Sequence, residues 1–135
     1  MIACGNGHKD VVQLLLDNSE RNIDLNTRDN LGWTAFMIAC IDGHTDVVQL
    51  LLDNSEMNID LNARDNDGDT AFMFACANGH KDVVQLLMDY SDKIELNAKD
   101  IHGWTAWMFV CFKGLMDVVQ LLLDHSDKIE LNAKK

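Results

Sequence analysis

The sequence predicts an all-α repeat solenoid, a stack of about four helix-turn-helix units from which short β-hairpin fingers project. Three observations support this class. Residues 1–36 and 37–72 align without a gap and differ at only seven positions. Each copy carries an apolar stripe that is wider than one helix pair can cover, so neighbouring copies must cover it. The cysteines recur at intervals of 36, 36 and 35 residues, at Cys4, Cys40, Cys76 and Cys111.

The 135 residues form a single array in this interpretation, with 47% hydrophobic and 24% charged residues, close to the globular average. The copies divide roughly into 1–28, which lacks its N-terminal part, 29–64, 65–99 and 100–135.

Each element of one copy has a local signal. Thr34 precedes AFMIAC and is a suitable N-cap for a first helix that runs to about Ile41. Gly43 then permits a tight turn, and a second helix opens at Asp46 and continues through VVQLLL. The polar segment NSEMN, the alternating IDLN and the Asp-Gly turn of RDNDGDT follow, which predicts an extended finger.

These motifs together resemble the ankyrin repeat over essentially the whole chain. D-x-x-G-x-T-A opens each copy, G-H and V-V-x-L-L-L lie inside it, and L-N-A-R or L-N-A-K closes it. The resemblance implies a curved stack of helix pairs with fingers at right angles, and a module that binds other proteins and does not catalyse a reaction. The usual T-P-L-H appears here as TAFM or TAWM, and the period exceeds the usual length of about 33 residues.

The two ends of the array lack the polar outer face that a terminal copy should carry. Met1 aligns with Met37, inside a first helix, and the chain stops at Lys135 where a further finger should begin. We therefore expect a piece of a longer array, or ends that are covered by self-association.

The charge excludes one class of partner. Lys and Arg number 11 against 22 Asp and Glu, which gives a formal net charge of −11 and argues against nucleic acid. A protein partner with a basic and apolar surface is the natural complement. Because the sequence has neither a membrane-spanning apolar run nor a signal peptide, we expect a cytoplasmic or nuclear location without secretion or membrane binding.

Three features invite a chemical interpretation and do not support it. Calcium binding around Gly68 would require ligands at Ala63 and Phe74, which cannot ligate. The recurring histidines at 8, 44 and 80 follow a turn glycine and should be structural, since equivalent positions lie at least a helix spacing apart. The cysteines should be reduced thiols that fill small core sites, with a redox role as the alternative.

The sequence contains no catalytic pairing and no phosphate-binding loop, so we expect neither an enzyme nor a cofactor. The class of function that remains is a protein-binding or scaffolding module. Two alternatives stay open: a fragment whose uncovered ends stack head to tail, and the targeting portion of a larger enzyme.

The differences between the first two copies indicate where a partner binds. Four of the seven lie at the finger tip or at the end of the first helix, which would line the concave face of such a stack. Free drift of surface positions is the alternative. Trp33 and Trp104 occupy the same finger position and would be aromatic anchors on either side of Asp69. The predicted contact residues are Leu31, Trp33, Ile41, Asp42, Asp67, Asp69, Ala77, Asn78, Ile101, His102, Trp104, Phe112 and Lys113.

Overall fold

The computed structural model describes residues 9–17 and 24–132, and within these ranges the regular structure is helical. The elements are α2 (Lys9–Asp17), α3 (Ala35–Asp42), α4 (Thr45–Asp53), the 3₁₀ turn η2 (Ser55–Met57), α5 (Ala71–Ala77), α6 (Lys81–Asp89), α7 (Ala106–Lys113) and α8 (Met116–Leu123).

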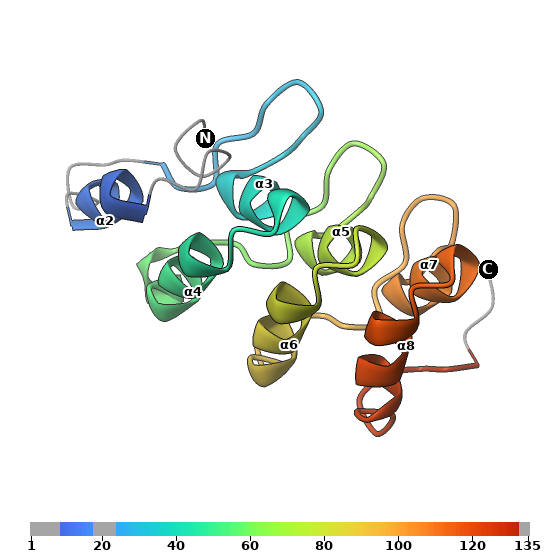
Figure 1. Ribbon diagram of the computed structural model, residues 1–135. Coiled ribbons are helices and arrows are strands. Elements are labelled where there is room, and N and C mark those ends of the chain that lie inside the picture. The colour runs from blue at the N-terminus through green and yellow to red at the C-terminus, as the bar shows by residue number, and fades with distance from the viewer. Residues whose placement is uncertain (1–8, 18–23, 133–135) are drawn as a thin grey trace.

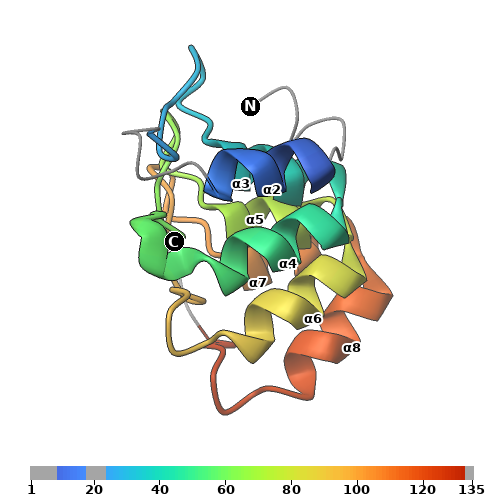
Figure 2. The ribbon, with the colours of Figure 1, turned by 90° about the vertical axis from the view of Figure 1, so that its left-hand side faces the viewer.

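The helices form two parallel rows that run along the stack (Figures 1 and 2). One row contains α3, α5 and α7, each packed on the next, and the other contains α2, α4, α6 and α8. Each helix of the first row also packs on the helix that follows it in the chain. The predicted all-α repeat solenoid is therefore confirmed.

Each helix of the first row begins at a threonine cap, as the sequence predicted for Thr34. The Thr34 hydroxyl accepts a hydrogen bond from the backbone N–H of Met37 at 3.2 Å. Thr70 and Thr105 cap α5 and α7 in the same way. All three threonines are only 2% exposed, so the cap supplies a hydrogen bond that water cannot.

The turn between the two helices of a copy depends on Gly43, which adopts a left-handed conformation with φ of 73°. His80 of the next copy packs directly on this glycine, and its Nε2 lies 2.7 Å from the carbonyl oxygen of Ile41. This contact gives His80 the structural role that the sequence predicted for the turn histidines.

The apolar stripe of the second helix is covered by neighbouring copies, as expected. In α4 every apolar residue is at most 8% exposed, and the set comprises Val47, Val48, Leu50, Leu51 and Leu52. The core therefore runs along the stack without a break between copies.

The prediction that the cysteines fill core sites is correct for two of them and wrong for Cys111. Cys40 and Cys76 are free thiols with 0% exposure, whereas Cys111 is exposed. The reason is positional: α7 and α8 are the last helices that the structure describes, and no further described pair covers them. Cys4 lies outside the described residues.

The fingers precede α3, α5 and α7 and project beyond the first row of helices (Figure 1). Their expected β-hairpins are not confirmed, because residues 24–132 contain no strand. The finger before α5 is instead a turn, in which the backbone N–H of Gly68 donates to the carbonyl of Asp65 at 3.0 Å.

The longest helices described, such as α4, have nine residues. None of the helices in this part of the chain is long and apolar enough to cross a membrane.

Candidate protein-binding surface

An aspartate at the base of each finger fixes its shape. Oδ1 of Asp65 accepts the backbone N–H groups of Asp67 and Asp69, each at 2.9 Å. Asp29 and Asp100 make the same pair of hydrogen bonds in their own fingers. The residue four positions after each aspartate is therefore held in an equivalent place, and these residues are Trp33, Asp69 and Trp104.

Hydrogen bonds also join each finger to the next. The backbone N–H of Asn66 donates to the carbonyl of Leu31 at 3.1 Å, and that of Ile101 donates to the carbonyl of Asp67 at 3.0 Å. The finger tips consequently form a row along the stack. Leu31 is 53% exposed and Ile101 is 65% exposed, while Asp67 and His102 are also exposed.

The C-terminal ends of α3, α5 and α7 form a second row of surface residues, in addition to the row of finger tips. The side-chain amide of Asn78 donates to the carbonyl of Ile41 at 3.2 Å, and Nζ of Lys113 donates to the carbonyl of Ala77 at 3.0 Å. Among the predicted contact residues here, Asp42, Asn78, Phe112 and Lys113 are exposed, and Ile41 and Ala77 are half-buried.

Trp104 connects the two rows in the fourth copy. Its ring stacks on Phe109 with centroids 5.1 Å apart, and it meets the edge of Phe112 at 5.5 Å. Phe112 is 78% exposed, and Met116, the first residue of α8, is 72% exposed. The structure thus brings the half-buried Trp104 into contact with the exposed Phe112, and we call this aromatic pair the Trp104 corner.

Trp33 has a structural role that the sequence did not reveal. Its indole Nε1 donates to Oδ2 of Asp65 in the next finger at 3.1 Å, and its ring meets Phe74 of the next copy in a T-shaped contact at 5.8 Å. These contacts join two copies. The side chain is half-buried, so part of its surface remains exposed.

Asp69 occupies the position at which the two adjacent copies have tryptophan, Trp33 and Trp104. Its Oδ1 is buried and has no hydrogen-bond partner among the described residues. Burial, a hydrogen bond with the Asp100 carboxyl and the negative charges of Asp100, Asp65 and Asp67 raise the pKa of Asp69 to about 7. Below that pH the centre of the surface carries less negative charge than its composition indicates.

The carboxylates of Asp65, Asp67 and Asp69 offer oxygens within 4.8 Å of one another. Both oxygens of Asp65 already accept N–H groups, from its own finger and from Trp33. We therefore assign this cluster to the architecture of the finger and assign no metal to it.

A second set of cross-links was missed in the sequence, although its asparagines recur at a constant place. The side-chain amide of Asn62 donates to the carbonyl of Lys93 at 2.9 Å and accepts from the backbone N–H of Glu95 at 2.8 Å. Asn26 and Asn97 each bridge to the following copy in the same way. The asparagine of the repeated L-N pair therefore clamps successive copies together.

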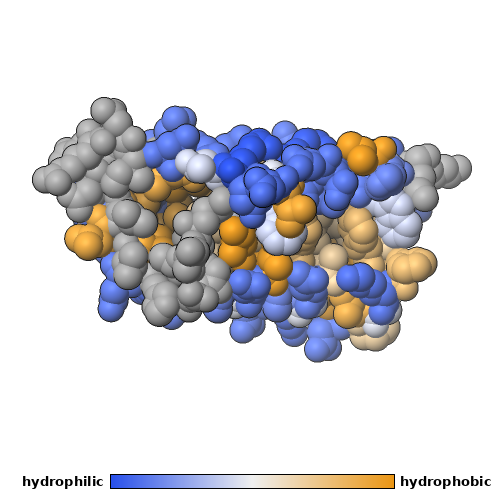
Figure 3. Space-filling view, turned by 90° about the horizontal axis from the view of Figure 1, so that it is seen from above, coloured by the Kyte–Doolittle hydropathy of each residue, from blue (hydrophilic) through white to orange (hydrophobic). Residues whose placement is uncertain are grey.

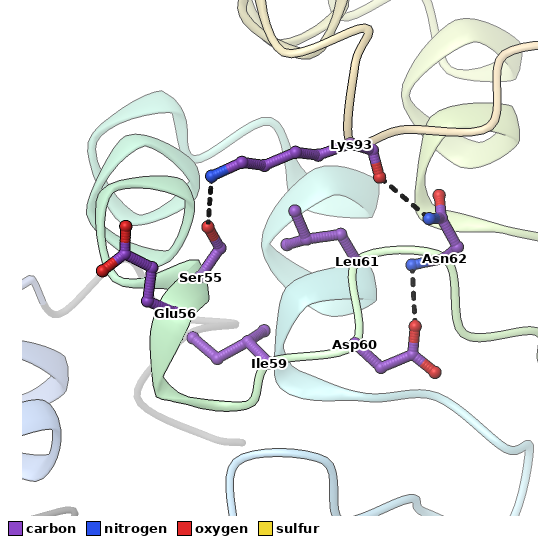
Figure 4. A pocket seen from close by; sticks show the side chains of 7 residues that line it. All are labelled: Ser55, Glu56, Ile59, Asp60, Leu61, Asn62 and Lys93. Carbon is purple, nitrogen blue, oxygen red and sulfur yellow. Dashed lines mark hydrogen bonds between the residues drawn. The ribbon is translucent and has the colours of Figure 1, made fainter.

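A polar hollow of about 270 Å³ lies beside the Asn62 clamp (Figure 4). Nζ of Lys93 donates to Oγ of Ser55 across it at 3.3 Å. It is lined by Ser55, Glu56, Ile59, Asp60, Leu61, Asn62 and Lys93. The hydrogen bonds of Lys93 with Ser55 and Asn62 join two copies. Among the lining side chains, these bonds pair no nucleophile with a general base.

Figure 3 shows the side from which the fingers project. Hydrophilic residues cover much of the visible surface, and hydrophobic side chains gather in separate patches between them.

The stacked helix pairs and cross-linked fingers define a repeat solenoid that presents a continuous, pre-formed surface. Residues 1–65 and 57–135 match the family of ankyrin repeats (3 copies), and the chain belongs to the ankyrin-repeat family. A comparison with curated proteins gave no match. Ankyrin repeats generally mediate protein–protein interaction, and domains built from them are typically non-catalytic.

Proposed function

We propose that the chain binds a partner protein through the two rows formed by the finger tips and the ends of the first-row helices. The partner would present apolar side chains around a Lys or Arg. The observation that carries this proposal is the Trp104 corner, where Phe112 is 78% exposed, together with Ile101 and Met116 of the same copy, which are also more than half exposed. Exposed clusters of large apolar side chains are typical of interaction sites.

The charge at the centre of the surface supports a cationic group on the partner. Asp42 and Asp67 are exposed, and Asp69 lies between the two tryptophan positions. Opposite charges across an interface accelerate association and select the orientation of the partner.

The cross-links between copies favour tight binding by such a surface. Backbone bonds join the finger tips, and the Asn62 clamp joins the loops. Because the surface is ordered before the partner arrives, binding requires little further loss of backbone entropy.

The experiment is affinity capture from a lysate with the wild-type chain and the Trp33→Ala/Trp104→Ala double variant, followed by identification of the retained proteins. Because Trp33 also joins two copies, circular dichroism must show that the double variant is folded. Leu14→Ser is the matched control, since Leu14 is 63% exposed on α2 at the other end of the stack. A partner retained equally by all three chains would refute the proposed placement.

A second candidate function is head-to-tail self-assembly, and one observation favours it. Leu123 is 41% exposed, whereas its counterparts Leu52 and Met88 are each 1% exposed because the next copy covers them. The outer face of α7 and α8 thus matches the face that each inner copy presents to its neighbour. Sedimentation over a wide concentration range tests this function, and a strict monomer throughout would exclude it.

A further inference from the structure

Asp69 and Asp100 face each other at the junction between the third and fourth copies. At the preceding junction, Trp33 occupies the place of Asp69 and donates its indole N–H to Asp65. The side chain of Asp69 carries no N–H group, although it lies within hydrogen-bonding reach of the Asp100 carboxyl group. At equivalent positions, the earlier junction therefore pairs an N–H donor with a carboxylate, whereas this junction pairs two carboxyl groups.

We propose that Asp69 and Asp100 share one proton across the interface between their fingers, so that the packing of the fourth copy on the third depends on pH. The proton supplies the hydrogen bond that the Trp33 indole supplies at the other junction. It resides on Asp69, because Oδ1 of Asp100 accepts two backbone N–H groups at 2.9 Å and these hydrogen bonds favour the ionised form.

The burial of Asp69 supports this assignment. Its Oδ1 receives no hydrogen bond from any N–H or O–H group of residues 9–17 and 24–132. A buried oxygen without a donor is far more costly on a carboxylate than on a neutral carboxyl group. A proton held between the two side chains removes that cost.

The charged groups around Asp69 act in the same direction. Asp65 and Asp67 lie on its own finger and Asp100 lies on the next, and all three raise its pKa, to about 7. The guanidinium of Arg64 is directed elsewhere: it donates to the carbonyls of Gly68 and Lys99 and lies 3.8 Å from a carboxylate oxygen of Glu95.

The direction of the pH effect follows from linkage. Because the pKa of Asp69 in the folded chain, about 7, exceeds the ordinary value of about 3.9, the folded state binds more protons than the unfolded state between these pH values. Stability from this pair is therefore fully present below about pH 4 and is lost as the pH rises through about 7. Since each copy contacts only its neighbours, the effect falls on the junction that holds the Trp104 corner.

The direct test is an NMR titration of the aspartate carboxyl carbons in the full wild-type chain. We expect the Asp69 signal to titrate with an apparent pKa near 7 and the Asp100 signal to respond over the same pH range. An Asp69 signal that titrates at the ordinary value of about 3.9 would overturn the proposal.

Variants provide a second readout through the Tm measured between about pH 5 and about pH 8. Asp69→Asn keeps a donor toward Asp100 and removes the titrating proton, so its Tm should fall less with rising pH than that of the wild type. Asp67→Asn is the matched control, because Asp67 lies exposed on the same finger, and it should retain most of the wild-type slope. Parallel Tm profiles for Asp69→Asn and the wild type would contradict the shared proton.

Discussion

The indole Nε1 of Trp33 lies 3.1 Å from Oδ2 of Asp65, a residue of the next finger. Oδ1 of the same aspartate holds two backbone N–H groups of its own finger. One carboxylate thereby determines the shape of its finger and its attachment to the preceding one. The predicted anchor Trp33 is thus also a structural residue.

Replacing Trp33 by Phe should remove this hydrogen bond while keeping a ring against Phe74. We expect a loss of about 1 kcal/mol in the free energy of unfolding, the usual net contribution of such a bond. Urea denaturation measures it. Leu31→Ala on the same finger is the control, since Leu31 is 53% exposed and its loss should change stability by at most about 0.5 kcal/mol. Equal stabilities of Trp33→Phe and the wild type would show that the bond contributes nothing.

Gly43 and Gly114 form a matched pair for testing the role of His80. Both adopt a left-handed conformation, with φ of 73° and 66°. A Cβ on Gly43 would lie 2.6 Å from Nδ1 of His80, whose ring is held by the Ile41 carbonyl, whereas a Cβ on Gly114 would meet nothing within 4 Å.

Gly114→Ala should therefore cost about 1 kcal/mol from backbone strain alone. Gly43→Ala should cost about 2 to 3 kcal/mol, because the clash is added to the strain. Urea denaturation of both variants gives the difference. If Gly114→Ala is as destabilised as Gly43→Ala, the packing of His80 on Gly43 is not important for stability.

The Asn62 clamp should be essential for holding the third copy on the second. Asn62→Ala removes two hydrogen bonds to the next copy and leaves the Glu95 N–H without its partner, so we expect a loss of about 1 to 3 kcal/mol. Hydrogen exchange should show faster exchange at the Glu95 amide. Asp60→Ala is a useful comparison, because Asp60 is exposed and bonds the N–H of Asn62 within one copy. An unchanged Glu95 amide in Asn62→Ala would contradict the clamp.

The thiols should differ sharply in reactivity. Cys40 and Cys76 are 0% exposed and burial raises the pKa of both thiols, so both the access of a reagent and the formation of the thiolate are suppressed. Cys111 is exposed. Iodoacetamide labelling of the native chain, mapped by peptide mass spectrometry, should modify Cys111 well before Cys40 and Cys76. Labelling of Cys40 at the rate of Cys111 would show that the core opens readily.

The parts of the fold that depend on local pattern could be predicted from the sequence. The Thr34 cap, the turn at Gly43 and the apolar face of α4 each follow from a few adjacent residues. The Asn62 clamp and the bond between Trp33 and Asp65 could not be predicted in this way, because they depend on how one copy is staggered against the next. The asparagine that recurs in every copy was the available signal.

The exposure of Cys111 was mispredicted for a related reason. Its sequence context resembles that of Cys76, yet its burial depends on a neighbour that the pattern of one copy does not specify. The residues that the sequence predicted as partner contacts lie in two rows in the structure, at the finger tips and at the ends of α3, α5 and α7. The sequence did not indicate that Asp69 would face Asp100, which changes the charge at the centre of the proposed binding surface.

The most direct test of the proposed binding surface is the affinity of a captured partner for Phe112→Ser, measured by titration calorimetry. Phe112 is 78% exposed, so its replacement should leave the fold intact while it removes an anchor of the Trp104 corner. We predict that Phe112→Ser weakens binding by about tenfold or more and that Leu14→Ser leaves the affinity unchanged. Equal affinities of the wild type and Phe112→Ser would contradict the placement of the partner on this surface.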